Sequence, residues 1–353
     1  MIGKHKILVG DCIEQMRTLP DGVARCCVTS PPYWRQRDYG IDGQLGLEGS
    51  PEEYTAGMVA VFREVHRLLA DDGSLWLNIG DKWASGGKWM VERGHAWDHA
   101  KNAKGWRKPP PGYKDKDLVG IPWMLAFALR ADGWFLRQCN VWAKPNGMPE
   151  SVTDRSTISH EYVFHLTKRN DYFYNGEAAR TPPAPASETR LAQNVEAQAG
   201  SERANGGGKT NGPMKAVRRS DKQRGHSQTH AGFNDRWDKM ERSEQQAKGS
   251  NLRSVWWIAP AQFREGHYAV MPERLAEICI VAGSSAGDTV LDPFCGAGTT
   301  GLVACRHGRN FIGTELNPEY AAMARKRIAR GLRPGTFRDD AAGESSLFSG
   351  GAA

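Results

Sequence analysis

The chain has 353 residues and a formal net charge of +7 at pH 7, enough length for one large α/β core with an insertion and a moderate basic excess that suits a polyanionic partner. It contains no long apolar run and no charged-then-apolar leader, which argues against a membrane span and a secretory signal. The seven cysteines show no C-x-x-C spacing, so we expect small buried side chains in a reducing cytoplasm and no metal site.

The first half of the chain alternates between predicted strands and helices. An amphipathic helix is expected over residues 51–70, where apolar side chains recur at three-four spacing and Asp72-Gly73 follows. A second apolar helix is expected over residues 118–130. Strands are expected over residues 7–9, 24–29, 74–79, 135–143 and 162–167.

A stiff loop, Ser30-Pro31-Pro32-Tyr33, follows the second strand. Two consecutive prolines fix their own φ and supply no backbone donor, so this tetrapeptide is expected to be extended. It offers a side-chain oxygen at Ser30, bare carbonyls at the prolines and an aromatic face at Tyr33. These groups can hold a flat ring that bears an amino group. Taken alone, such a loop more often marks a strand end with a buried tyrosine.

The second half contains a strand, a glycine-rich turn and a helix start. An apolar strand over residues 289–291 leads into Asp292, and Gly296-Ala297-Gly298 precedes a helix over residues 301–305. Such a turn allows close approach of a ligand to backbone N–H groups. The next strand, residues 311–315, ends in Glu315, 23 residues after Asp292, which is about the spacing at which an acid reaches a ribose diol. The third glycine of a dinucleotide fingerprint is missing, which argues against NAD.

Four polar residues thus stand at or just past the ends of apolar strands: Asp11, Ser30, Asp292 and Glu315. Alternating strands and helices predict a parallel doubly wound sheet, which binds ligands beyond the carboxyl ends of its strands. We therefore expect all four side chains to face one crevice.

Positive charge is concentrated in two loop-rich segments. Residues 82–117 carry nine Lys and Arg against four Asp and Glu, and residues 178–252 carry thirteen against eight. This distribution is typical of a phosphate-binding surface, although solvated basic loops would give the same count.

Together, the Ser-Pro-Pro-Tyr loop and the Asp292–Thr300 signature resemble those of the amino-methylating DNA methyltransferases, which use S-adenosylmethionine. The resemblance covers most of residues 4–330. Because the catalytic tetrapeptide precedes the glycine loop, the order looks like the circularly permuted, beta-class members. It implies a doubly wound, mostly parallel seven-stranded sheet with an inserted recognition region. Residues 267–272 resemble the element that closes over the methionine end of the cofactor.

The resemblance also implies site residues. The catalytic residues it implies are Ser30, Pro31, Pro32 and Tyr33. The cofactor-binding residues it implies are Asp11, Cys12, Pro272, Asp292, Phe294, Gly296, Gly298, Thr299 and Glu315. Double-stranded DNA is the expected partner, and the candidate DNA-binding residues are Arg218, Arg219, Lys222, Arg224 and Arg236. A cognate restriction endonuclease and a homodimer stay open as further partners.

The expected organisation has four parts. They are a catalytic half over residues 1–177 with a DNA-contacting loop at 82–117, a target recognition region at 178–252, a cofactor-binding half at 253–330 and a disordered tail at 331–353.

The sequence leaves the target base open. Relatives with Ser first in the tetrapeptide mostly methylate cytosine N4, and those with Asp or Asn mostly methylate adenine N6, so Ser30 favours cytosine. A hydroxyl can accept one amino hydrogen and donate to cytosine N3, but adenine N1 could serve in the same way. Methylation at cytosine carbon 5 needs a thiolate, usually in a Pro-Cys context, and the chain has no Pro-Cys dipeptide. The alternatives are adenine N6, an RNA or small-molecule substrate, and a DNA-binding protein with a decayed active site.

Overall fold

The computed structural model describes residues 3–84, 109, 112–147, 149–181, 249–261 and 270–332. The chain divides into two compact units, residues 1–179 with 253–339 and residues 180–252 with 340–353. All the named helices and strands belong to the first unit. None of the helices in the described ranges is long and apolar enough to cross a membrane.

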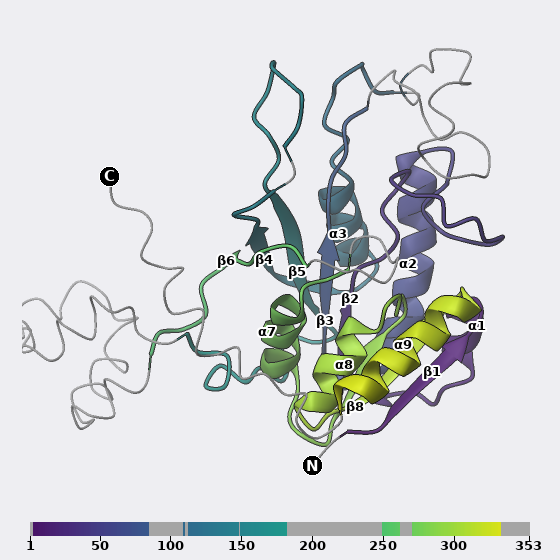
Figure 1. The fold of residues 1–353 in the computed structure, drawn as a ribbon, viewed down its shortest axis with the longest axis vertical. Coiled ribbons are helices and arrows are strands. Elements are labelled where there is room, and N and C mark those ends of the chain that lie inside the picture. Colours follow the sequence, from purple (N-terminus) through teal and green to yellow (C-terminus); the bar gives the residue numbers. More distant parts are fainter. Residues whose placement is uncertain are drawn as a thin grey trace, which may run out of the picture. The chain divides into compact units, whose positions relative to one another are not determined.

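The helices and strands alternate along the chain (Figure 1). In chain order they are β1 (His5–Val9), α1 (Cys12–Arg17), β2 (Ala24–Thr29), α2 (Pro51–Leu68), β3 (Leu69–Ile79), α3 (Ile121–Ala131), β4 (Phe135–Ala143), β5 (His160–Thr167), β6 (Val255–Trp257), α7 (Glu273–Gly283), β7 (Thr289–Asp292), α8 (Thr299–Arg306), β8 (Asn310–Glu315) and α9 (Pro318–Gly331).

All the described strands form one sheet in the order β1-β8-β7-β2-β3-β5-β4-β6. The five strands from β1 to β3 run parallel to one another, and β5 runs antiparallel to both β3 and β4. The predicted mostly parallel α/β sheet is confirmed. It has eight strands where the family resemblance implied seven, because the three-residue strand β6 adds to β4 at one edge.

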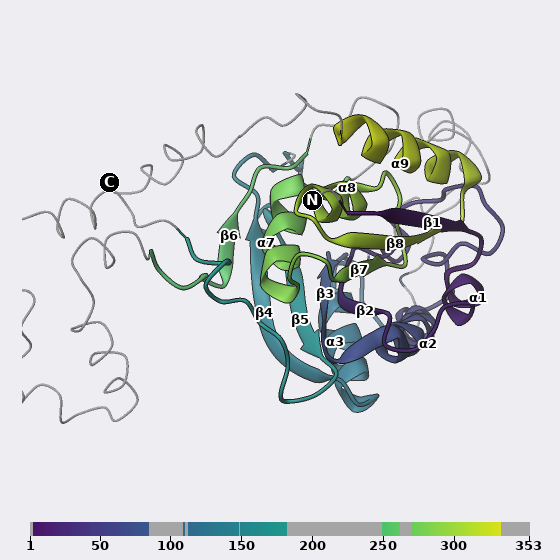
Figure 2. The same cartoon turned by 90° about the horizontal axis from the view of Figure 1, so that it is seen from below.

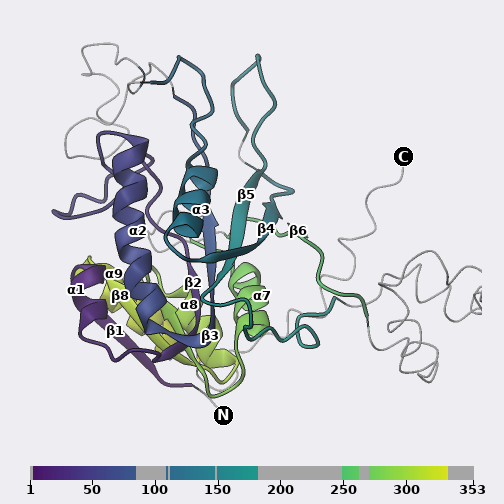
Figure 3. The same ribbon diagram turned by 180° about the vertical axis from the view of Figure 1, so that it is seen from behind.

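Helices cover both faces of the sheet, as expected for a doubly wound fold. In Figure 2, α7, α8 and α9 lie on one face and α1, α2 and α3 on the other. Figure 3 shows the second group from behind, with α2 between α1 and α3. Within each group the middle helix contacts its two neighbours. The sheet is therefore the central layer of three.

Helix α2 shows how the sequence sets an element and where the prediction was wrong. Ser50 and Glu53 form a reciprocal capping box at its start, and the predicted apolar stripe is fully buried. The helix ends at Leu68, not at residue 70, because Leu69 is already extended and pairs with Ala24. The register then jumps to the pair Cys26–Ser74, so residues 70–73 form a bulge inside β3.

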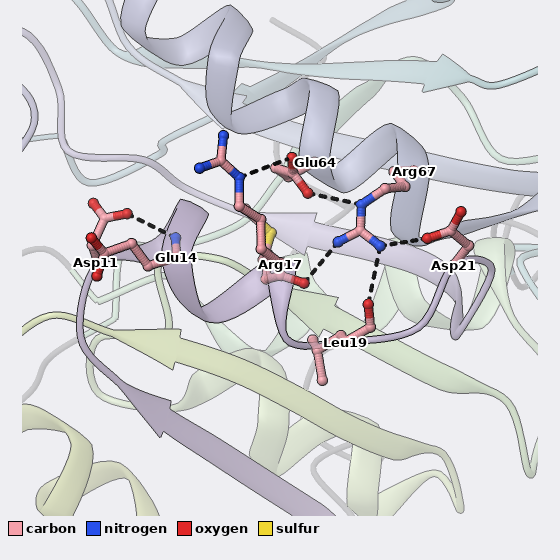
Figure 4. Close-up of polar contacts among 8 residues, drawn as sticks. Asp11, Glu14, Arg17, Leu19, Asp21, Glu64 and Arg67 are labelled. Carbon is pink, nitrogen blue, oxygen red and sulfur yellow. Dashed lines mark hydrogen bonds and ion pairs between the residues drawn. The ribbon is translucent and has the colours of Figure 1, made fainter.

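Arg67, near the end of α2, ties α1 and the following turn to this helix (Figure 4). Its guanidinium donates to the carbonyl oxygens of Met16 at 2.8 Å and Leu19 at 3.0 Å. It also forms ion pairs with Asp21 at 2.5 Å and Glu64 at 2.9 Å. These contacts hold the end of α1 and the turn that follows it against α2.

All seven cysteines lie in the described residues as free thiols, and six of them are buried. The prediction that they serve as small buried side chains is confirmed for those six.

Candidate active site

The four predicted polar residues lie at the ends of four neighbouring strands. Asp11 follows β1, Glu315 ends β8, Asp292 ends β7 and Ser30 follows β2, and these strands are adjacent in that order. Because the strands are parallel, their carboxyl ends share one edge of the sheet. The sheet therefore brings together residues that are up to 304 positions apart in the chain.

Asp292 links the cofactor half of the site to the catalytic half. Its Oδ1 accepts hydrogen bonds from the Thr29 hydroxyl at 2.7 Å and from the backbone N–H of Phe294 at 3.0 Å. Its side chain is almost fully buried, and this burial raises the pKa of Asp292 to about 6. A positively charged ligand beside Asp292 would stabilise the ionised carboxylate, which burial makes unfavourable.

Glu315 holds the glycine loop to the end of β8. Its Oε2 accepts from Gly296 N at 2.7 Å, and its Oε1 accepts from Asn317 N at 2.9 Å. Burial raises the pKa of Glu315 above its ordinary value. Each carboxylate oxygen keeps a further lone pair, which is the requirement for accepting from a pair of neighbouring hydroxyl groups.

Gly298 was predicted to contact the cofactor, and its missing Cβ also lets α8 pack closely against α9. It is the N-cap of α8 with φ +77°, and a Cβ there would lie 2.8 Å from Cβ of Ala324 on α9. The glycine thus permits close packing of two helices as well as the left-handed turn. Thr299 is similarly engaged, because its hydroxyl oxygen accepts from Arg327 of α9 at 2.8 Å.

Pro272 is connected to the glycine loop indirectly, through the adjacent residue Glu273. It is the N-cap of α7, and the adjacent Glu273 pairs with Arg327 at 3.1 Å. Arg327 also donates to the carbonyl of Ala297 in the glycine loop at 3.1 Å. The start of α7 is therefore tied to the loop, whereas His267 and residues 262–269 lie outside the described residues.

Asp11 and Cys12 occupy the first turn of α1. Asp11 Oδ1 caps this helix by accepting from Glu14 N at 3.0 Å, and Cys12 is buried. Burial raises the pKa of the Cys12 thiol to about 12. Gly10 N donates to the carbonyl of Glu315 at 3.0 Å, which places Asp11 beside the end of β8.

The Ser-Pro-Pro-Tyr loop contains a short chain of hydroxyl groups. The Ser30 hydroxyl donates to Oη of Tyr33 at 3.3 Å. The Tyr33 ring packs against Gly80, where a Cβ would lie 2.9 Å from Cε2 of the tyrosine. One expectation is corrected: the Pro32 carbonyl is not bare, because the Tyr54 hydroxyl donates to it at 3.0 Å.

Sequence reasoning missed a partly buried polar cluster, the Glu161 cluster, which is formed by Tyr33, Asn78, Lys144 and Glu161. Glu161 Oε2 accepts from the Tyr33 hydroxyl at 2.5 Å and from Asn78 Nδ2 at 3.0 Å, and its Oε1 pairs with Lys144 at 2.5 Å. The side chains of Lys144 and Glu161 are only 22% and 16% exposed. Because β5 is antiparallel, its beginning, not its end, lies at the active edge. An acid at the start of a strand gives no such signal in the sequence.

The predicted DNA-contacting segments are described only at their ends. Arg218, Arg219, Lys222, Arg224 and Arg236 all lie outside the described residues. Thr181 and Ser250 form an isolated antiparallel bridge, so the segment between them leaves and returns at one place. In the other segment, Lys116 forms an ion pair with Asp154 at 2.6 Å and the Arg155 guanidinium lies 3.3 Å from the Trp83 ring centroid.

These residues fit the S-adenosylmethionine that the family resemblance implies. A buried carboxylate at Asp292 suits a cationic sulfonium, Glu315 suits a ribose diol, and the glycine loop allows backbone to approach a ligand. The described residues contain no group of three or more His, Cys, Asp and Glu side chains arranged to hold a metal ion.

Comparisons with known proteins show the family to which the chain belongs. A profile of a DNA methylase family, the N6/N4 group, matches residues 24–326. The chain is 40% identical to the type II methyltransferase M.SmaI of Serratia marcescens over 92% of this chain and 91% of that protein. It is 41% identical to M.XycI of Xanthomonas campestris pv. cyanopsidis over 90% of this chain and 86% of that protein.

Solved structures show the same fold. The PvuII DNA methyltransferase, described as cytosine-N4-specific, matches with a TM-score of 0.56 and 16% identity over 97% of this chain and 90% of that one. The Thermus thermophilus protein TTHA0409, solved with S-adenosyl-L-methionine, matches with a TM-score of 0.53 and 23% identity over 94% and 95%. The family match, the relatives and the site together show that this chain belongs to the S-adenosyl-L-methionine-dependent DNA methyltransferases that modify an exocyclic amino nitrogen, the N4/N6 family.

Proposed function

We propose that the protein transfers a methyl group to N4 of a flipped-out cytosine in duplex DNA, directly and without a covalent enzyme intermediate. The observation that carries this proposal is the position of Ser30. It stands at the end of β2, next to the strand that ends in Asp292, and Thr29 is hydrogen-bonded to that carboxylate. A base held by Ser30 would therefore lie beside the cofactor residues.

The chemistry follows from the groups at this edge. The amino nitrogen of cytosine is a weak nucleophile because its lone pair is delocalised into the ring. Ser30 Oγ and the Pro31 carbonyl would accept hydrogen bonds from its two N–H groups and so favour a tetrahedral nitrogen, while Tyr33 would stack on the ring. The nitrogen would release one of these hydrogens as a proton to solvent when it gains the methyl group. S-adenosyl-L-methionine supplies an electrophilic methyl group on a positively charged sulfur. Asp292 would stabilise that positive charge in the bound state.

The relatives support a place in restriction and modification. M.SmaI and M.XycI are described as type II methyltransferases, and the chain covers most of each. We therefore infer a cytoplasmic modification enzyme with a cognate endonuclease as its functional counterpart. Cytosine is favoured over adenine by Ser30 and by the cytosine-N4 specificity of the PvuII enzyme, which has the same fold. Adenine N6 is the alternative.

Sequence recognition is proposed to lie in residues 178–252, with residues 82–117 as a second DNA-contacting loop. The support is the local excess of positive charge in both segments. Arg218, Arg219, Lys222, Arg224 and Arg236 would divide between phosphates, which set the register, and base edges, which specify the sequence.

The product identifies the target base. Duplex DNA is incubated with the protein and radiolabelled cofactor, digested to nucleosides, and separated by chromatography with mass detection. We expect label in N4-methyldeoxycytidine. Label in N6-methyldeoxyadenosine would show that the alternative is correct, and label in 5-methyldeoxycytidine, which has the same mass as the N4 isomer, would contradict both.

A further inference from the structure

The hydrogen bonds of the Glu161 cluster run in one direction. Three groups converge on the Glu161 carboxylate, and the amide of Asn78 and the ammonium of Lys144 can only donate to it from where they stand. Because Lys144 and Asn78 both donate to it, the Glu161 carboxylate is the acceptor of this cluster. The Tyr33 hydroxyl must then give its single hydrogen to Glu161.

The direction of the Tyr33–Glu161 hydrogen bond also fixes the direction of the hydrogen bond between Ser30 and Tyr33. Once Tyr33 has given its hydrogen to Glu161, its oxygen can only accept, and the neighbouring donor is Ser30 at 3.3 Å. Burial and the nearby Glu161 charge raise the pKa of Tyr33 well above its ordinary value, so the phenol keeps its hydrogen at working pH. The Ser30 hydrogen is thus directed into the protein, and the Ser30 lone pairs are left for a substrate.

We propose that Glu161 is a positioning residue that fixes the direction of the chain Ser30–Tyr33–Glu161 and so presents Ser30 Oγ to the target amino group as an acceptor only. This inference rests on the proposed function, in which Ser30 holds that amino group. It also removes one option open from the sequence, since a Ser30 hydrogen given to Tyr33 cannot be donated to the base ring.

Glu161→Gln tests the direction while keeping the size of the side chain. Lys144 only donates, so it holds the amide oxygen of the glutamine and turns the NH₂ group towards Tyr33, where the hydrogen bond from Asn78 is also lost. The tyrosine then accepts and gives its own hydrogen to Ser30, whose hydrogen points at the target amino group. We expect the single-turnover methyl-transfer rate on duplex DNA to fall by about 10- to 100-fold, the size of effect that follows the loss of a hydrogen bond that orients a metal ligand. The cofactor and DNA dissociation constants should stay unchanged.

The decisive variant is the double one with Tyr33→Phe. Phenylalanine keeps the aromatic ring but has no hydroxyl group to donate to Ser30. The reversed chain of hydrogen bonds expected in Glu161→Gln is therefore broken. Tyr33→Phe alone should cost several-fold in rate, and Glu161→Gln/Tyr33→Phe should transfer faster than Glu161→Gln and match Tyr33→Phe within about twofold. A structural role for Glu161 predicts the opposite, an additional loss in the double variant.

Controls separate the possible failures. Glu64→Gln changes a glutamate in the ion-pair network around Arg67, far from the active edge, and should leave the transfer rate unchanged. If Glu161→Gln does not fold, judged from its thermal midpoint, Tyr33→Phe is compared with Tyr54→Phe, which removes a hydroxyl from the same loop outside the chain. Equal rates for these two variants would overturn the proposal.

Ser30→Ala is measured in the same assay. If it transfers at the wild-type rate, the proposed function of Ser30 fails and the inference fails with it. If Ser30→Ala is inactive but Glu161→Gln transfers normally, only the inference fails.

Discussion

Thr29 donates its hydroxyl hydrogen to Oδ1 of Asp292 over 2.7 Å, and so joins the last residue of β2 to the last residue of β7. These residues are 263 positions apart in the chain. The bond couples the strand that carries the catalytic loop to the strand that carries the glycine loop. Because the Thr29 hydrogen bond lowers the pKa of Asp292, the catalytic half of the site influences the ionisation of a residue in the cofactor half.

Cofactor affinity should depend on pH through Asp292. Burial raises the pKa of Asp292 to about 6, so the free protein is protonated there below pH 6 and charged above it. A positively charged sulfonium binds better to the charged form. Affinity should therefore rise as pH increases from 5 towards 7 and then level off. Isothermal titration calorimetry measures this, and Asp292→Asn should bind weakly with no such rise. A flat profile in the wild-type protein would exclude the Asp292 contact.

Thr29→Val should move this pH dependence upward. Valine keeps the shape of the buried threonine but removes a hydrogen bond that favours the charged carboxylate. A bond to a charged group contributes about 1.5–3 kcal/mol, so the midpoint of the affinity profile should shift by about 1–2 pH units. Thr55→Val is the control, because its hydroxyl bonds to Pro51 O inside α2, away from Asp292. An identical midpoint in wild type and Thr29→Val would show that the bond does not tune Asp292.

Gly298→Ala and Gly120→Ala form a matched pair for stability. Both glycines are helix N-caps in the left-handed region, with φ +77° and +84°, so the backbone strain of alanine is similar. Only at Gly298 would the new Cβ meet another helix, 2.8 Å from Ala324 Cβ, whereas nothing lies within 4 Å at Gly120. Gly298→Ala should lower the free energy of unfolding by about 1–3 kcal/mol more than Gly120→Ala. Equal losses in urea unfolding would mean that α8 and α9 adjust without cost.

The sequence predicted the parallel half of the site better than the antiparallel half. Asp11, Ser30, Asp292 and Glu315 each follow an apolar strand, and the rule that ligands bind beyond strand carboxyl ends placed them together correctly. Glu161 stands at the beginning of β5, and only the reversal of this strand against β3 brings it to the same edge. That reversal is a tertiary pairing, which a pattern of apolar residues does not reveal.

Side-chain bonding was equally invisible in the sequence. The Pro32 carbonyl was expected to have no hydrogen-bond donor, but the hydroxyl group of Tyr54 on α2 donates to it. Gly298 was assigned to the cofactor, and the structure shows that its missing Cβ also makes room for α9. The end of α2 was misplaced because the pairing of Leu69 with Ala24 ends the helix before the glycine signal is reached. In each case a distant partner decides the local outcome.

Removing residues 190–245 should test the recognition region. Thr181 and Ser250 are bridged, so the remaining residues can close the gap without separating the strands on either side. We expect the deletion variant to bind cofactor normally but to lose preference for the wild-type site, measured by sequencing methylated positions in a mixed DNA substrate. Methylation of the same site with the same selectivity would assign recognition elsewhere.

The central claim is that Ser30, at the edge of the sheet next to Asp292, holds the reacting amino group, and single-turnover transfer by Ser30→Ala tests it most directly. Ser30 contacts the base and not the cofactor in this account, so the variant should bind S-adenosyl-L-methionine and duplex DNA like wild type. Its transfer rate should fall by about 100-fold or more, the cost typical of losing one preorganised hydrogen-bond partner of a reacting group. Transfer at close to the wild-type rate, with both affinities intact, would contradict the account.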